Sequence, residues 1–564
     1  MCGIFYYHHH GNVKKLSTGK LKTLQELFYK TSHRGPDNSI FLNRHSRCYG
    51  FHRLSINGLG NIGNQPFECK GCLLICNGEI YNFKHLIEKY RIDDYSENGS
   101  DCEIIIHLYK RIGMKATLNE LDGVFAMVLV DYERDETYIA RDPFGVRSLY
   151  VGTTDNDIGV GGRRGELFAV SEMKSLPSDV TRSQVPSGSY GRYVCNGPME
   201  YERYYNACNK FYEYNIDTTM TDEAQICSTI KTLLEKAVIK RLMSERPIGA
   251  LLSGGIDSTL VTALLCKNMS DPSKLNTFSI GLEGSVDLYW GKMAANYFGT
   301  THHEVCLTET EFLSAIEYTI YQIESYDTTS VRASLPNYLI SKYIYNTTDS
   351  VVIFCGDMSD EIFGSYRGFT KATSEAAFKM ENERMVRDVR YFDLLRSDKT
   401  ISGAGLEARV PFADKEFLNF VMSIPPRFKM FTDERIEKHI LRQAFSDATD
   451  SNGRPLLPSD LLWRRKEAFS DGVSSNNNNN NNNNRTWVQM MKENADACIS
   501  DAEWNEYERA GVSSALNAPY DKESYYYRKI YDKYYKGSIP IPYWWKHPFC
   551  TEKDPSARLL KCYK

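Results

Sequence analysis

The chain has 564 residues, of which 42% are hydrophobic and 25% charged, as expected for a folded protein with more than one domain. Its formal net charge of -4 gives no reason to expect nucleic acid or anionic lipid as a partner. The longest apolar stretch, at 124–130, is far too short to span a membrane, and no basic-then-apolar leader precedes Cys2. Fifteen cysteines spread along so long a chain are typical of reduced thiols, so we expect a cytoplasmic protein.

The first part of the chain, residues 2–204, is rich in predicted strands. Short apolar runs between polar turns are typical of antiparallel hairpins, and they occur at 48–56, 72–76, 124–132, 137–140, 149–152 and 167–170. Helical patterns interrupt them at 21–30 and at 102–112, the second after an N-cap candidate in Ser100 or Asp101. We expect one domain here, followed by a polar, aromatic connector at 205–221.

The second part, residues 222–546, has a different pattern. Helical segments alternate with short apolar strands, as in "IGALLSGGIDSTLVTALLCK" and "SVVIFCGDMSDEIF". This alternation predicts an α/β domain in which helices cover a parallel sheet. Nine consecutive asparagines at 476–484 cannot bury apolar surface, so we expect a disordered insertion near 475–485 and assign it no function. Residues 547–564 form a C-terminal tail.

Cys2 is the candidate nucleophile of the first domain. It is small enough for Met1 to be removed, which would give one residue both a thiol and a free α-amine. By itself, however, position 2 could hold any small residue. Asn77 and Gly78 follow an apolar strand in "NGEIYN", where a side-chain amide and a backbone N–H could stabilise a developing oxyanion.

Three charged residues could bind an amino acid by both of its charged ends. Arg53 in "HRLSIN" has the planar guanidinium that suits a carboxylate, and Glu79 and Asp101 could accept hydrogen bonds from an ammonium group. Each residue also has an ordinary structural interpretation, as a surface ion pair, a turn or a helix cap. As an ordered set after Cys2, they predict a site that presents the side chain of an amino acid to a thiol.

The order and spacing of "MCGIF", "SHRGPD", "RLSI", "NGEIYN" and "GSDCE" resemble the class II glutamine amidotransferase domain. The resemblance implies an N-terminal α+β four-layer sandwich of the N-terminal-nucleophile type. It also implies that the Cys2 thiolate attacks the carboxamide of glutamine, forms a glutamyl thioester and releases ammonia, with its own α-amine as general base. The implied glutamine site also includes Leu54, Ser55, Ile56 and Asn57.

The segment "LLSGGIDS" is the strongest signal of the second domain. An apolar strand runs into Ser253, Gly254 and Gly255, and an apolar helix follows Asp257 and Ser258. Backbone N–H groups of such a loop and of the helix N-terminus form an anion nest that suits phosphates. The spacing of a Walker A loop is absent.

Another apolar strand ends in "CGDMSDE". Loops after parallel strands meet at one edge of the sheet, so Asp257 and Asp360 could share Mg²⁺ bound to pyrophosphate. Lys466 in "RRKEAFSDG" could neutralise the polyphosphate, or it could belong to a solvated basic run. Thr329 and Arg332 in "YDTTSVRAS" could hold a second substrate by its carboxylate.

This second part resembles the asparagine synthetase domain, an α/β fold of the ATP pyrophosphatase type whose signature is SGGxDS. "FSIGL", "HHE", "SDEIFGSY", "GLEARVPF", "EKHILR" and the terminal "DPSAR" also read as family segments, so the resemblance covers nearly the whole chain. It implies that Leu252 and Ile280 contact adenine through backbone groups and that Cys355 and Gly356 line the ATP site. It further implies that ATP converts aspartate to β-aspartyl-AMP, that ammonia passes internally from the first site, and that a homodimer is possible.

One motif departs from the family pattern, which is usually SGEGSDE where this chain has "CGDMSDE". Cys355 replaces a serine, and Met358 replaces a glycine. Asp357 replaces the glutamate tied to forming the acyl-adenylate and deprotonating ammonia, which shortens the side chain by about 1.5 Å. A misplacement of that size can lower a rate by about 100-fold.

The sequence therefore leaves three hypotheses for the function. The leading hypothesis is glutamine-dependent amidation of aspartate. A second is an amidotransferase acting on another carboxylate, against which "YDTTSVRAS" and "GLEARVPF" argue because these segments line the aspartate side of the family's site. A third is a glutaminase with an impaired synthetase half, which rests on "CGDMSDE" alone.

Overall fold

The structure is a computed structural model that describes residues 1–9, 15–96, 99–154, 165–194, 199–206, 222–432, 434–465, 472–474, 486–511, 517–536, 545–550 and 554. Lys466, the asparagine tract and most of the predicted connector lie outside these residues. Within them, no helix combines the length and the apolar character needed to cross a membrane.

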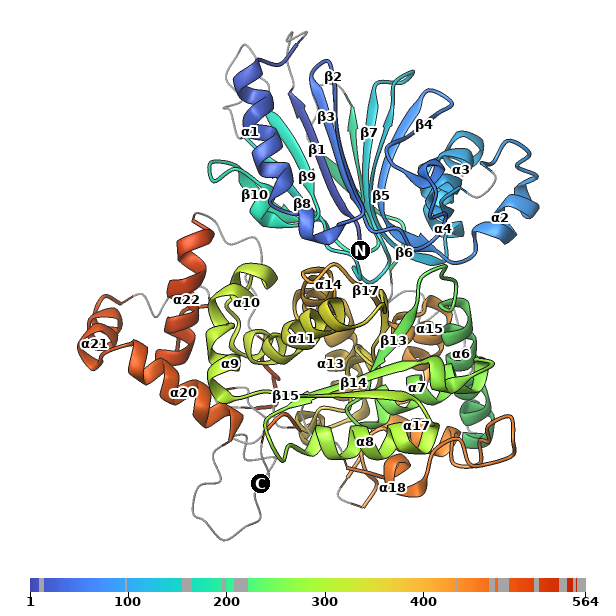
Figure 1. The fold of residues 1–564 in the computed structure, drawn as a ribbon, viewed down its shortest axis with the longest axis vertical. Helices are drawn as coiled ribbons and strands as arrows, with labels where there is room; N and C mark the ends of the chain where they lie inside the picture. Colours follow the sequence, from blue (N-terminus) through green and yellow to red (C-terminus); the bar gives the residue numbers. More distant parts are fainter. Residues whose placement is uncertain are drawn as a thin grey trace.

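Two six-stranded antiparallel sheets form the N-terminal part (Figure 1). Their strand orders are β10-β8-β9-β1-β3-β2 and β12-β11-β7-β6-β5-β4. In chain order the strands are β1 (Gly3–His9), β2 (Asn38–Arg44), β3 (Arg47–Arg53), β4 (Phe67–Cys69), β5 (Cys72–Ile80), β6 (Gly123–Asp131), β7 (Glu136–Arg141), β8 (Tyr150–Thr153), β9 (Glu166–Val170), β10 (Thr181–Gln184), β11 (Ser189–Val194) and β12 (Glu200–Arg203).

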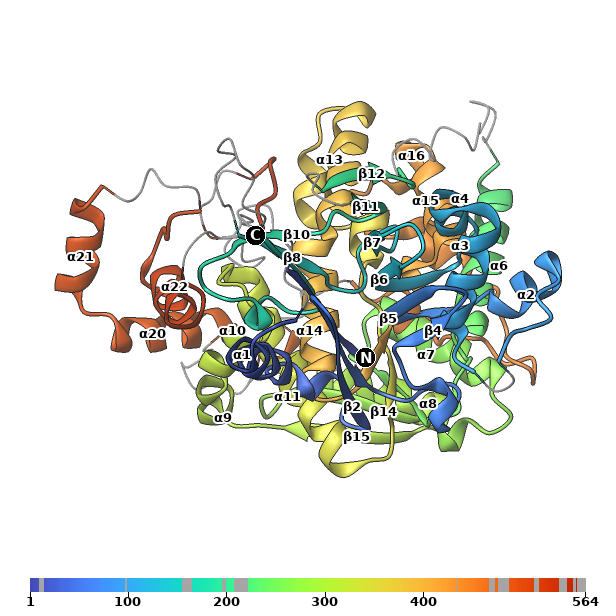
Figure 2. The same cartoon turned by 90° about the horizontal axis from the view of Figure 1, so that it is seen from above.

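The two sheets pack face to face through alternating apolar side chains. Ile4 and Tyr6 of β1 belong to the same buried cluster as Leu73 and Ile75 of β5. Helix α1 (Thr18–Tyr29) covers the outer face of the first sheet, and α2 (Phe83–Tyr90), α3 (Ile104–Ile112) and α4 (Met114–Glu120) lie outside the second (Figures 1 and 2). The expected four-layer sandwich is confirmed.

The second part is built on a five-stranded parallel sheet, with the order β15-β14-β13-β16-β17. Its strands are β13 (Ile248–Leu251), β14 (Asn276–Gly281), β15 (Thr301–Cys306), β16 (Val352–Phe354) and β17 (Glu407–Arg409). The chain enters at β13, in the middle of the sheet, and adds strands first on one side and then on the other. The loops after β13 and β16 therefore flank the point where α/β sheets bind ligands.

Helices surround this sheet, and three of them, α20 to α22, project to one side of the molecule (Figures 1 and 2). The helices of the second part are α6 (Glu223–Lys240), α7 (Ile256–Asn268), α8 (Val286–Phe298), α9 (Glu309–Ser314), α10 (Ile316–Ile323), α11 (Thr328–Thr347), α12 (Ser359–Phe363), α13 (Glu375–Asp388), α14 (Asp393–Ser402), α15 (Lys415–Ser423), α16 (Pro426–Lys429), α17 (His439–Ala444), α18 (Ser459–Leu462), α20 (Trp487–Cys498), α21 (Asp501–Arg509) and α22 (Lys522–Tyr534).

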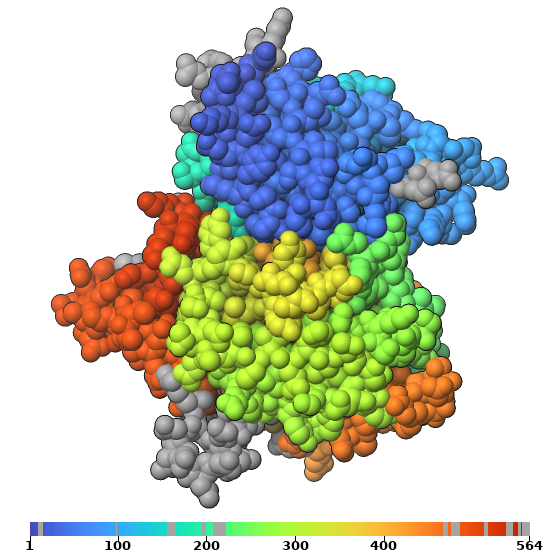
Figure 3. Space-filling view, in the orientation of Figure 1, coloured from blue at the N-terminus to red at the C-terminus, as the bar shows by residue number. Residues whose placement is uncertain are grey.

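The N-terminal part rests directly on the second part (Figure 3). Met1, at the start of the chain, is buried. The Met1 ammonium donates a hydrogen bond to the Leu406 carbonyl, just before β17, at 2.8 Å. Arg34 pairs with Glu172 at 2.8 Å and with Asp398 of α14 at 3.2 Å, and all three side chains are buried. Removing one partner of a buried ion pair is strongly destabilising, so these contacts fix the two parts relative to each other.

Most predicted elements are present, with shifted boundaries. Helix α1 begins three residues before the predicted start because the Ser17 side chain caps it by accepting from the Lys20 amide. Strand β5 continues beyond the predicted run to Ile80 because it pairs with β6 along its whole length. Of the two N-cap candidates, Ser100 is the one whose side chain caps the turn that leads into α3.

Candidate active sites

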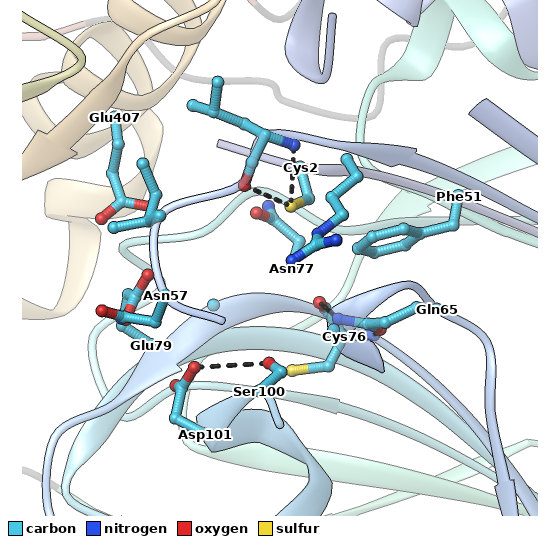
Figure 4. Close-up of a pocket in the computed structure, with 15 residues that line it drawn as sticks. Cys2, Phe51, Asn57, Gln65, Cys76, Asn77, Glu79, Ser100, Asp101 and Glu407 are labelled. Carbon is cyan, nitrogen blue, oxygen red and sulfur yellow. Dashed lines mark hydrogen bonds between the residues drawn. The ribbon is translucent and has the colours of Figure 1, made fainter. Parts of the chain in front are cut away.

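The first site is a pocket beside Cys2, close to the start of β1 and the end of β3 (Figure 4). All the residues predicted to bind glutamine line it except Ser55, whose amide donates to Asp37 at 2.8 Å. The lining residues are Cys2, Phe51, Arg53, Leu54, Ile56, Asn57, Gly63, Gln65, Cys76, Asn77, Gly78, Glu79, Ser100, Asp101 and Glu407.

The Cys2 thiol lies against the backbone that follows β3. The Leu54 amide donates to Cys2 Sγ at 3.4 Å, and the Arg34 Nε donates to the Cys2 carbonyl at 2.9 Å. Burial raises the pKa of the Cys2 thiol to about 11, although the nearby ammonium of Met1 acts in the opposite direction. The thiol is therefore protonated at neutral pH and needs a base to become a nucleophile.

Asn77 and Gly78 have the properties of an oxyanion site. Figure 4 shows the Asn77 amide beside the Cys2 thiol, and its Nδ2 is buried without a hydrogen-bond partner among the described residues. A Cβ at Gly78 would lie 2.3 Å from the Val124 carbonyl of β6, so only glycine fits there. An unpaired buried donor beside a nucleophile is costly unless a ligand accepts from it.

The two predicted acceptors for an ammonium group are also buried in the pocket. Asn57 donates to Glu79 Oε2 at 2.7 Å, and the Ile80 amide donates to Asp101 Oδ2 at 2.5 Å. Burial raises the pKa of Glu79 well above its usual value and that of Asp101 to about 6. A cation that enters the pocket therefore favours the ionised form of both carboxylates.

Arg53 differs from the open carboxylate clamp that the sequence predicts. Its Nη1 donates to the Gly60 carbonyl at 2.9 Å and to Asn64 Oδ1 at 2.7 Å, and its Nη2 donates to the Gly58 carbonyl. The guanidinium therefore organises the 58–64 loop as well as facing the pocket.

The pocket also includes residues that the sequence did not predict there. Gln65 holds the wall together by donating to the Cys76 carbonyl at 3.0 Å and accepting from the Cys76 amide at 2.6 Å. Glu407 comes from β17 of the second part, whereas the sequence places its segment "GLEARVPF" on the aspartate side. That segment was recognisable in the sequence, but its contact with the first site depends on how the two parts dock.

The second site begins at the predicted anion nest after β13. Gly254 has a φ of +74°, and a Cβ there would lie 2.3 Å from Trp290, so glycine is required twice over. Ser253 and Ser258 hydroxyls lie 3.1 Å apart, and the Ser253 hydroxyl accepts from the Gly255 amide at 3.3 Å. The loop is thus closed by its own serines.

The two loops at the centre of the sheet are in direct contact, as predicted. Gly356 packs against Asp257, since a Cβ at position 356 would lie 2.8 Å from the Asp257 Cβ. Lys438, which the sequence did not single out beyond its segment "EKHILR", has its buried Nζ 2.6 Å from both Asp257 and Asp360. The two predicted metal-binding carboxylates therefore face one another across an ammonium group.

The remaining nucleotide residues lie around these loops. Leu252 is buried, and its amide donates to the Phe278 carbonyl at 2.8 Å, which brings it beside Ile280 near the end of β14. Cys355 is buried, with Sγ 3.4 Å from the Ser397 hydroxyl. Lys466 lies outside the described residues.

The loop that departs from the family pattern has an unusual backbone at Met358 and a tightly held carboxylate at Asp357. Met358 is buried and has a φ of +74°, so it adopts the left-handed conformation that favours glycine. The Asp357 carboxylate accepts from Arg396 at 2.7 Å on one oxygen and from Ser397 at 2.6 Å on the other. The shorter carboxylate is held against α14 by both oxygens.

The predicted carboxylate-binding pair lies at the start of α11. Thr329 Oγ1 is buried without a hydrogen-bond partner among the described residues. Arg332 was expected to be open to substrate, but it is buried and paired: Glu523 of α22 binds its Nε at 2.8 Å, and Asp554 binds Nη1 at 3.1 Å and Nη2 at 3.3 Å. Distant parts of the chain supply both partners, so no local sequence pattern predicts these two contacts.

Together, the thiol pocket on a four-layer sandwich and the phosphate loop on a parallel sheet define a two-domain glutamine amidotransferase. Residues 1–213 match the glutamine amidotransferase domain family, and residues 229–388 and 371–539 match the asparagine synthase family. The chain is 39% identical to glutamine-hydrolysing asparagine synthetase from Gallus gallus, with 100% of this chain and 99% of the relative covered. It is 37% identical to the Rattus norvegicus enzyme and 36% identical to the Homo sapiens enzyme, with 95% of each chain covered. The chain belongs to the family of glutamine-hydrolysing asparagine synthetases.

Proposed function

We propose that this chain converts ATP, L-aspartate, L-glutamine and water to L-asparagine, L-glutamate, AMP and pyrophosphate. Full-length similarity to glutamine-hydrolysing asparagine synthetases supports the overall reaction. The observation that carries the proposal is the pair of sites in one chain: an Asn77 Nδ2 beside Cys2 with no hydrogen-bond partner in the described part of the chain, and two carboxylates facing each other beside the predicted phosphate-binding loop.

In the first site, removal of Met1 makes the Cys2 α-amine the base. The amine takes the thiol proton, the thiolate attacks the glutamine carboxamide, and Asn77 and Gly78 donate to the oxyanion. The tetrahedral intermediate then collapses and its C–N bond breaks. The departing nitrogen takes the proton that the α-amine holds and leaves as ammonia. Water then hydrolyses the thioester to glutamate.

In the second site, the Ser253–Ser258 segment binds the phosphates of ATP through backbone amides. Asp257 and Asp360 fit Mg²⁺, because this ion is commonly held by one or two carboxylates together with substrate phosphates. When bound, Mg²⁺ neutralises charge on the pyrophosphate group. Lys438 lies between the same carboxylates and would compete with the ion for them.

Aspartate is held through Thr329 and Arg332, with its α-carboxylate in the place that Asp554 occupies on the guanidinium. Its side-chain carboxylate attacks the α-phosphorus of ATP, and pyrophosphate leaves. Ammonia attacks the resulting acyl carbon, Asp357 accepts a proton, and AMP leaves. The buried contacts between the two parts keep this ammonia from water, where it would be protonated.

A glutaminase with an impaired synthetase half is the second candidate, because Asp357 replaces the longer residue of the family. The left-handed φ of Met358 argues against impairment, since the loop keeps the path that glycine would allow.

The test is product formation by the purified chain with ATP, Mg²⁺ and aspartate, and with either glutamine or ammonium as nitrogen donor. Asparagine and pyrophosphate from both donors are expected, and Cys2→Ala should abolish only the glutamine-driven reaction. Glutamate without pyrophosphate would show that only the first site works. Product from an acceptor other than aspartate would favour the other amidotransferase.

A further inference from the structure

One buried arginine contacts both candidate sites. Arg409 is the last residue of β17, and its side chain is fully buried. Its carbonyl accepts from the Cys355 amide at 3.0 Å, and the Cys355 thiol lies 3.6 Å from the same oxygen. The backbone of Arg409 is therefore bonded to the loop that precedes Asp357.

The guanidinium of Arg409 points the other way, toward the first site. Its Nη2 lies 3.7 Å from Glu79 Oε1 and has no hydrogen-bond partner among the described residues. The rest of the group is fixed, because Nε donates to Glu407 at 3.0 Å and Nη1 donates to the Met243 carbonyl at 2.6 Å and to the Arg241 carbonyl. A rigid buried cation thus directs a free N–H at the carboxylate of the pocket.

The charge of Glu79 depends on this contact. Burial raises its pKa well above the usual value, and Asp101 and Glu407 raise it further, while Arg409 and, to a smaller extent, Arg147 lower it. A carboxylate that binds the ammonium group of an amino acid must be ionised and correctly oriented. In the N-terminal part alone, Glu79 would have lost this cation.

We propose that Arg409 is a positioning residue of the glutamine site, supplied by the synthetase half, and that it acts through Glu79. Because its backbone is bonded to the Cys355–Asp357 loop, a ligand that shifts this loop also shifts the arginine. Glutamine affinity therefore responds to the occupancy of the ATP and aspartate site, and the coupling is reciprocal. This inference rests on the proposed function, in particular on glutamine binding at Glu79.

The experiment is a double-mutant cycle with Arg409→Lys and Glu79→Gln in the full chain. Lysine keeps the charge but loses the fixed fork that the Glu407, Met243 and Glu79 contacts require. We expect R409K to raise the KM for glutamine by about 10-fold in glutamate release, a size within the range of coupling energies between contacting residues of one ion-pair network. Ammonium-dependent pyrophosphate release should stay within about twofold of wild type, which shows that the fold and second site are intact.

Two further readouts separate a positioning role from a structural one. In the E79Q background, R409K should produce no additional rise in KM, because its partner is already neutral. In wild type, saturating ATP and aspartate should change the KM for glutamine, and R409K should reduce that change. Arg182→Lys, in a buried arginine of β10 that donates to the Pro177 carbonyl, is the matched control and should leave both readouts unchanged.

An additive rise in the E79Q background, an unchanged KM in R409K, or an equal loss of both activities would overturn the inference. Failure of the proposed function is distinguishable, because wild type would then release no aspartate-dependent pyrophosphate. The cycle would still be readable on glutamate release alone.

Discussion

Replacement of Lys438 by methionine tests the electrostatics of the second site. Its Nζ lies 2.6 Å from both Asp257 and Asp360, so the substitution removes the positive charge that this lysine places between the two carboxylates. Two unit charges about 5 Å apart repel by about 3 kcal/mol at an effective dielectric constant of about 20. The carboxylate side chains are only 22% and 20% exposed, so solvent relieves this repulsion in part, and we expect K438M to lower the free energy of unfolding by about 1–3 kcal/mol.

The assay is urea unfolding with and without MgCl₂. If the two carboxylates bind Mg²⁺, an ion concentration about tenfold above its Kd should restore about 1–2 kcal/mol to K438M, and less to wild type, where the ion competes with lysine. Lys240 is a matched control, because its Nζ also bridges two carboxylates, Asp122 at 2.6 Å and Asp414 at 2.8 Å. K240M should gain little from Mg²⁺, since Asp414 keeps a second cation. The reasoning would be refuted if K438M had the same free energy of unfolding as wild type, or if MgCl₂ did not change the free energy of unfolding of K438M.

Three other outcomes follow from the described contacts. Asp554→Asn should lower the KM for aspartate severalfold, because the amide competes less well for Arg332; a raised KM would show that Asp554 helps to bind substrate. Ser397→Ala should lower ammonium-dependent synthesis about 10-fold, because the Asp357 carboxylate loses one of the two partners that orient it; an unchanged rate would count against this. Burial lowers the pKa of Lys429 to about 7, so the unfolded chain binds more protons between about pH 7 and 10 and stability should rise with pH there by about 1 kcal/mol per unit. Lys429→Met should abolish that slope in unfolding experiments, and a persisting slope would assign it to another group.

The sequence predicts the two architectures well because local pattern and sheet geometry agree. The apolar runs that become β5, β6 and β7 are also the strands that pair in the sheet. The meeting of Asp257 and Asp360 could likewise be predicted, since loops at the carboxyl ends of adjacent parallel strands share one edge.

Contacts made by docking and by distant segments could not be predicted in this way. Glu407 lines the first pocket, and Arg409 lies 3.7 Å from Glu79 of that pocket, only because β17 lies under the N-terminal part. Arg332 was expected to face substrate, and no local pattern shows that residues about 190 and 220 positions later fill its guanidinium. The conformation of Met358 could not be predicted either, because only the backbone shows that this methionine adopts the left-handed conformation that favours glycine.

The central claim is that nitrogen leaves glutamine at Cys2 and reaches aspartate at the second site. It is tested most directly by giving the chain ATP, Mg²⁺, aspartate and amide-¹⁵N glutamine in the presence of excess unlabelled ammonium, and by measuring the label in the asparagine amide. Retention of ¹⁵N in most of the early product, lost in Cys2→Ala while unlabelled asparagine still forms, is the predicted result. Unlabelled asparagine from the unmodified chain, with labelled ammonia in solution, would show that the two sites work separately and would contradict the account.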